Sequence, residues 1–162
     1  MVLGMSLGLF TLMHTIISLV AIALGFVVMY GVVTSNRMPS VTVWFLLLTI
    51  VTSASGYLFP VTGILPSHIV GAISLVLLAV AGVALYGFRL SGLWRVTYVV
   101  TALLALWFNV FVLFIQLFVK FPAFAALAPK QNEPPFLAVQ GATLLFFVIM
   151  IVLGLKRFRP AI

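Results

Sequence analysis

Five long apolar stretches, almost without charge, constrain the fold of this chain more than any other feature of its sequence. They cover residues 8–33, 41–59, 68–88, 95–119 and 136–155. A helix needs roughly 20 apolar residues to cross the hydrocarbon of a bilayer. Because lipid offers the backbone no hydrogen-bond partner, each stretch must pair its own N–H and C=O groups, as a helix does. The sequence therefore predicts an all-α fold, a polytopic transmembrane helix bundle of about five spans, with residues 1–162 in one domain.

The composition supports a membrane protein and argues against a soluble one. Only 6% of the residues are charged and 65% are hydrophobic, with a mean hydropathy of +1.42, whereas soluble domains carry roughly 25% charged residues. The net charge of +7 would suggest nucleic acid in a soluble protein, but here the basic residues lie beside apolar stretches. The expected partners are therefore the lipid bilayer and other membrane subunits or further copies of the chain, and nucleic acid is not expected.

The near absence of acidic residues excludes several classes of enzyme. Glu133 is the only carboxylate side chain, and the sequence contains no Asp and no Cys. Paired-carboxylate hydrolysis, two-metal phosphoryl transfer, a Ser-His-Asp triad and a buried carboxylate proton relay all need groups that this chain lacks. Iron–sulfur and thiolate sites are excluded in the same way. Soluble-type catalysis is not expected, and no catalytic residue is assigned.

The basic residues predict the orientation in the membrane. Loops alternate between the two sides, so six cations share one side, namely Arg37, Arg89, Arg95, Lys156, Arg157 and Arg159. The other side has Lys120 and Lys130, in the outer loop 120–135. Cytoplasmic loops carry an excess of Lys and Arg. We therefore expect a bacterial inner (plasma) membrane protein with its N-terminus outside and its C-terminus in the cytoplasm.

Small and polar residues recur at helical spacing and predict the faces on which the helices pack. In the first helix these are His14, Ser18, Ala21 and Gly25. In the third they are His68, Ala72, Leu75, Ala79 and Gly82, and in the fourth Ala102, Ala105, Asn109, Val112 and Gln116. The second helix offers Thr49, Thr52, Ser53 and Gly56, and the fifth Gln140 and Thr143.

Four polar residues fall near the outer ends of their helices and form a candidate ligand site. They are His14, His68, Gln116 and Gln140, with Asn109 deeper in the membrane. Two histidines on separate helices suit axial ligation of haem b or, with a third group, copper or zinc, and His or Gln donors suit a quinone. The alternative is structural, because buried His, Gln and Asn side chains often only join helices by hydrogen bonds.

Several short segments carry a resemblance to known sequences. They are residues 65–71 (LPSHIVG), the pair Trp94-Arg95, residues 109–112 (NVFV) and the loop 128–136 (APKQNEPPF). With these segments the chain resembles an uncharacterised group of small multi-pass inner-membrane proteins of proteobacteria. The resemblance implies a bacterial inner-membrane location and brings no activity, ligand or catalytic residue.

Three functions are compatible with the sequence. The leading hypothesis is a non-enzymatic accessory or structural subunit of a larger membrane assembly or a homo-oligomer, because the chain has no soluble domain and almost no acid but does have faces suited to helix contacts. The second is a haem-, metal- or quinone-binding redox protein that uses His14 and His68. The third is a small transporter or channel with a path along Asn109 and Gln116.

Overall fold

The computed structural model describes residues 2–60, 63 and 66–160, and among these residues the regular structure is helical. Five of its helical segments are long and apolar enough to cross a membrane, which confirms the prediction of an all-α bundle with about five spans. The elements are α1 (Leu7–Val33), α2 (Pro39–Ser55), η1 (Gly56–Leu58), α3 (Pro66–Gly82), η2 (Val83–Gly87), α4 (Leu93–Lys120), α5 (Pro122–Leu127) and α6 (Pro134–Arg157).

Proline sets where four of the α-helices begin. Pro39, Pro66, Pro122 and Pro134 are the first residues of α2, α3, α5 and α6. A first-turn N–H has no partner within its helix, so proline loses nothing there, and its fixed φ already suits the helix. Helix α1 begins differently, because the Ser6 hydroxyl accepts a hydrogen bond from the Leu9 N–H at 3.3 Å.

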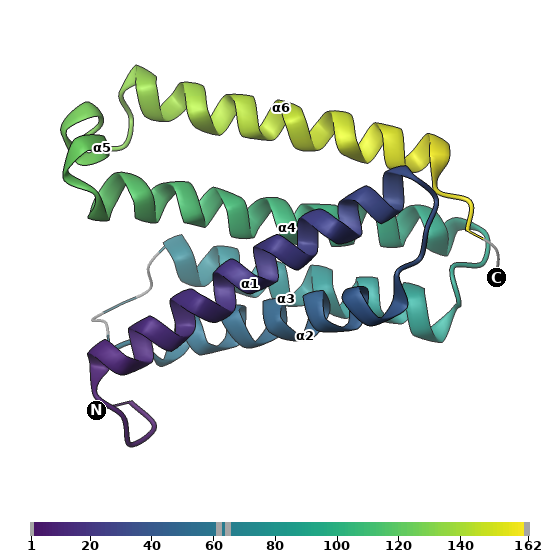
Figure 1. Cartoon of the computed structure of the whole chain (residues 1–162), viewed down its shortest axis with the longest axis horizontal. Coiled ribbons are helices and arrows are strands. Elements are labelled where there is room, and N and C mark those ends of the chain that lie inside the picture. The colour runs from purple at the N-terminus through teal and green to yellow at the C-terminus, as the bar shows by residue number, and fades with distance from the viewer. Residues whose placement is uncertain (1, 61–62, 64–65, 161–162) are drawn as a thin grey trace.

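Helix α4 lies at the centre of the bundle and contacts α1, α3, α5 and α6, while α2 packs against α1 and α3. Successive spans run in opposite directions (Figure 1). One end of the bundle therefore holds the six cations named above, and we call it the cationic end. The opposite end, which holds His14, His68, α5 and Glu133, is called the histidine end.

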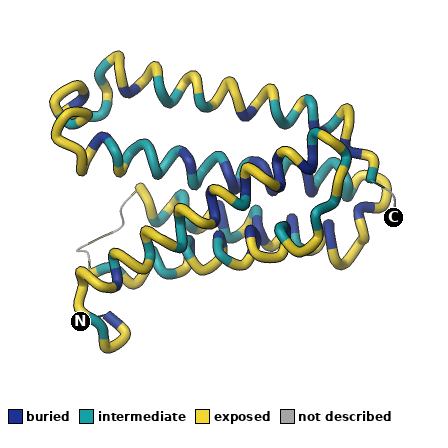
Figure 2. Tube along the Cα trace, viewed as in Figure 1, coloured by how far each residue is buried: buried dark blue, intermediate teal, exposed yellow. Residues whose placement is uncertain are grey.

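The larger hydrophobic core lies toward the cationic end. There Tyr98, Leu103 and Leu106 of α4 are at most 2% exposed, and Phe158 after α6 is 1% exposed. Figure 2 shows buried residues concentrated on α4 and on the adjacent halves of α1 and α3, whereas α6 is exposed along most of its length. A smaller cluster of Phe118, Ala128 and Phe136 joins α4, the loop and α6 at the histidine end.

The packing faces expected for α1 and α2 are the faces that the structure buries. Ala21 and Thr49 are 0% exposed, and Gly25 is buried where a Cβ would overlap Leu106 and Phe45. The Ser18 hydroxyl donates to the His14 carbonyl oxygen at 2.7 Å within α1, and its oxygen lies 3.3 Å from Thr52 Oγ1 across the two helices.

The packing face expected for α3 is wrong by one residue. Ala72 and Ala79 are exposed, and the buried residues are Ser74, Leu78 and Ala81. Small residues recur at the same spacing on both faces of α3, so their size alone does not tell which face meets the neighbouring helices. In α4, Ala102 and Ala105 are 0% exposed as expected, but Gln116, at the end of the expected face, is exposed.

Candidate functional site

His14 on α1 contacts the end of α2. Its Nδ1 lies 2.9 Å from Ser55 Oγ, and its ring meets Phe59 edge-on at 5.2 Å between centroids. Ser55 has one hydroxyl proton, which it donates to the Thr52 carbonyl oxygen at 3.2 Å. Ser55 Oγ lies within hydrogen-bond distance of both His14 Nδ1 and the Thr52 carbonyl oxygen, and so joins α1 to the end of α2.

His68 on the first turn of α3 contacts the same segment of chain. Its ring stacks on Tyr57 at 5.2 Å with an interplanar angle of 16°, and the Tyr57 hydroxyl donates to the His68 carbonyl oxygen. A Cβ on Gly71, one turn later, would lie 3.3 Å from the Tyr57 ring, so the absence of a side chain there lets the tyrosine lie close to α3.

The two imidazoles thus lie against one five-residue segment, residues 55–59, at the end of α2. His14 contacts Ser55 and Phe59, and His68 stacks on Tyr57, which lies between those two residues in the sequence. The structure brings both histidines to the same end of the bundle from α1 and α3. Among the described residues, however, no group of three or more His, Cys, Asp or Glu side chains is placed to hold a metal ion.

The three amides have other surroundings. Gln140 on α6 donates from Nε2 to the Phe111 carbonyl oxygen at 3.1 Å, while its buried Oε1 has no partner within the described part of the chain. Asn109 Nδ2 lies 3.5 Å from Thr49 Oγ1, which is a long hydrogen bond. Gln116 is exposed on α4. Gln140 and Asn109 therefore join helices, as the structural alternative expects.

Glu133 organises the loop before α6. Its carboxylate accepts from the backbone N–H of Lys130 at 3.0 Å and of Asn132 at 3.1 Å. Desolvation acts to raise the pKa of Glu133, but these hydrogen bonds and the nearby Lys130 charge outweigh it and lower the pKa below its usual value. Glu133 is therefore an anion at neutral pH, and its carboxylate holds the loop backbone through these two hydrogen bonds.

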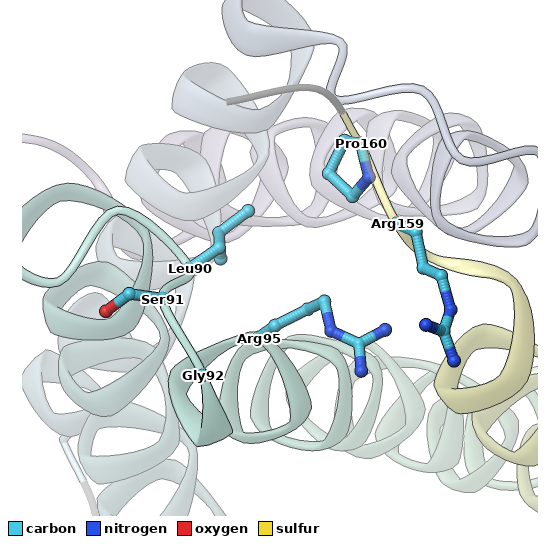
Figure 3. Close-up of a pocket in the computed structure, with 6 residues that line it drawn as sticks. All are labelled: Leu90, Ser91, Gly92, Arg95, Arg159 and Pro160. Carbon is cyan, nitrogen blue, oxygen red and sulfur yellow. The ribbon is translucent and has the colours of Figure 1, made fainter.

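Two cavities fall outside the sequence-based site. The first, of about 340 Å³, is at the cationic end and is lined by Leu90, Ser91, Gly92, Arg95, Arg159 and Pro160 (Figure 3). The second, of about 310 Å³, lies between α1, α4 and α6 and is lined by Phe26, Val110, Phe114, Ala142, Thr143, Phe146 and Phe147. The sequence analysis did not predict the first cavity, because it interpreted Arg95 and Arg159 only as signals of orientation in the membrane. The sequence feature that could have indicated an anion site is the absence of acidic residues near these arginines.

The fold and its apolar helices define the chain as a multi-pass integral membrane protein. Comparison with protein-family models, curated proteins and solved structures finds no significant match.

Proposed function

We propose that this protein is a non-enzymatic accessory or structural subunit that associates with other membrane subunits, or with further copies of itself, through the exposed face of α6. The observation that carries the proposal is the poor coverage of this helix. Within the most apolar 18-residue stretch of α6, only 11% is buried inside the chain, against 28–39% in the other four spans. Among the other spans, α6 packs mainly against α4 and α1.

The residues on this face favour another helix over lipid as the neighbour. Ala138, Gly141, Ala142 and Leu145 are exposed and share one side of α6. A Cβ on Gly141 would meet nothing within 4 Å. In membranes, small residues at this spacing allow two helix backbones to approach and gain van der Waals contacts. Ala142 also lines the apolar cavity between α1, α4 and α6, so a side chain from a partner helix has space to enter there.

Replacement of Gly141 by Leu tests the proposed face, with Ala79→Leu as the matched control. Ala79 is exposed on α3, so both changes place a leucine on a lipid-accessible surface. We expect Gly141→Leu to weaken association by about tenfold, since interfacial van der Waals contacts are lost, and Ala79→Leu to leave it unchanged. Energy transfer between labelled copies in liposomes measures self-association, and co-purification after mild crosslinking measures a second subunit. A strict monomer without a crosslinked partner would refute the proposal.

The proposed location is the bacterial inner membrane, with the cationic end on the cytoplasmic side. This proposal is supported by the distribution of charge, six cations at one end against Lys120 and Lys130 at the other. The resemblance to proteobacterial inner-membrane proteins points the same way.

A second candidate function is ligand binding at His14 and His68. It is favoured by the shared contact of both rings with residues 55–59. Haem b, a metal ion and a quinone are the candidate ligands. The absorption spectrum and metal content of the purified protein test the first two, and a colourless, metal-free sample would exclude both. Solvent extraction followed by chromatography tests the quinone. The transporter hypothesis stays a prediction, to be tested by liposome flux in Asn109 and Gln116 variants.

A further inference from the structure

The cationic end gathers positive charge without an acidic side chain to neutralise it. Six of the eight Lys and Arg residues lie there, whereas Glu133, the only carboxylate side chain, precedes the opposite end of α6. Helix α6 has 24 residues, so Glu133 is about 36 Å away along the helix axis at 1.5 Å per residue. The side chains of this chain therefore supply no counter-ion for these arginines.

Two of the arginines line one cavity. Arg95 comes from the first turn of α4 and Arg159 from the segment that follows α6, and together with residues 90–92 and Pro160 they line an open cavity of about 340 Å³. Figure 3 shows both guanidinium groups reaching into the same space between the start of α4 and the C-terminal segment. Two positive charges that share a cavity repel one another unless an anion lies between them.

Hydrogen bonds hold this cavity in shape. Arg95 Nη1 donates to the Phe158 carbonyl oxygen at 2.6 Å, and the Arg159 backbone N–H donates to Ser35 Oγ at 2.8 Å. Phe158 is 1% exposed and packs its ring near Tyr98, 5.8 Å between centroids. The C-terminal segment is thus joined to α4 and to the α1–α2 loop, which holds the Arg95 guanidinium and the Arg159 backbone on the same cavity.

The depth and the donors both fit a phosphate group. An arginine carries five N–H donors in a planar arrangement that matches phosphate oxygens in pairs, and Arg95 uses one nitrogen on Phe158. The cavity lies beside Trp94, which stacks on Phe88 at 4.0 Å. Tryptophan at the end of a span is typical of the lipid headgroup region, where phosphate esters are the most abundant anions.

We propose that this cavity binds the phosphate of an anionic phospholipid from the adjacent leaflet, with Arg95 and Arg159 as its charged ligands. Basic pockets between transmembrane helices bind anionic headgroups by the same combination of charge and paired hydrogen bonds. The site is independent of the face of α6 proposed for association and of the two histidines.

The experiment uses the full chain, purified in a mild detergent and stripped of lipid, and probes it with phosphatidylglycerol. Native mass spectrometry measures how much phosphatidylglycerol stays bound relative to phosphatidylcholine. Arg159→Gln is the main variant, because its side chain is exposed and the contact to Ser35 is made by its backbone. Arg89→Gln is the matched control, since it removes the same charge from the same end at an exposed residue outside the cavity.

We expect Arg159→Gln to lower phosphatidylglycerol retention by about tenfold or more and Arg89→Gln by a few-fold at most, because only the first removes a paired, charge-assisted contact. Arg95→Lys keeps the charge but loses the planar pair of donors, so its retention is expected to fall as well. Equal losses in Arg159→Gln and Arg89→Gln would overturn the proposal in favour of general surface attraction. Displacement of the lipid by equimolar inorganic phosphate would overturn the assignment to a lipid and identify a site for free phosphate.

Discussion

Replacing Gly154 with alanine tests how closely α6 approaches α1 and α4. A Cβ at this residue would lie 2.7 Å from Val32 Cγ1 and 2.9 Å from Val99 Cγ1, well inside the roughly 3.5–4.0 Å at which carbon atoms attract one another. Valine in a helix has one strongly preferred rotamer, so these methyl groups do not turn aside easily. The helices themselves must move apart.

The magnitude follows from two opposing effects. Overpacking of a core costs about 1–3 kcal/mol, and Gly→Ala within a helix returns up to about 1 kcal/mol of helix propensity. Gly82→Ala is the control, because a Cβ there meets nothing within 4 Å and only the favourable effect remains. Gly154→Ala should therefore have a free energy of unfolding about 1–3 kcal/mol below that of Gly82→Ala.

Denaturant unfolding in a mild detergent, followed by tryptophan fluorescence, measures this difference. If the two variants unfold at the same denaturant concentration, α6 does not pack against Val32 and Val99 as closely as the structure shows.

Three further predictions can be checked with the same protein. Phe158→Ala should lower the free energy of unfolding by about 3–5 kcal/mol, because it leaves a cavity at a buried position. His14→Ala should lower it by only about 0.6 kcal/mol, the typical value of a hydrogen bond between membrane helices. Equal losses for the two variants in unfolding assays would contradict this prediction. The lowered pKa of Glu133 means that its contribution is present above pH 4.5 and is lost as the pH falls through the lower folded value. Relative to an unfolded reference substrate at the same pH, pepsin cleavage of the loop should therefore accelerate below pH 4.5 in the wild type, and Glu133→Gln should show no such relative acceleration. In a chain without cysteine, Lys130→Cys should react with an impermeant thiol reagent from outside intact cells and Arg37→Cys should not; labelling of both from one side would refute the orientation.

The fold class could be predicted from the sequence because most of the chain must fold in the hydrocarbon of a bilayer. Long apolar stretches have a single stable backbone solution in hydrocarbon, and turn residues such as Pro39 and Pro66 mark where helices begin. The packing faces of α1 and α2 also follow, since small residues such as Ala21 and Gly25 let the neighbouring helices approach closely.

The face of α3 and the composition of the sites could not be predicted in the same way. Ala79 and Ala81 are equally small, so which of them meets α4 depends on how the whole bundle is arranged. The histidines share residues 55–59 because η1 follows α2 and directs Tyr57 to α3, a local geometry that periodicity does not encode. Arg95 and Arg159 are 64 residues apart and meet only because the C-terminal segment folds back over α4.

The two ends of the bundle are held together by different interactions, and this difference accounts for where the proposed sites lie. At the cationic end, large buried side chains such as Tyr98 and Phe158 pack the C-terminal segment against α4, and this brings Arg95 and Arg159 to one cavity. At the histidine end, the contacts of His14 and His68 with residues 55–59 include hydrogen bonds and ring contacts around η1. Such contacts are individually weak, because the unfolded state in a membrane also finds polar partners. The buried side chains around Arg95 therefore support an anion site at the cationic end, whereas a ligand at the histidine end must compensate for the contacts that it replaces.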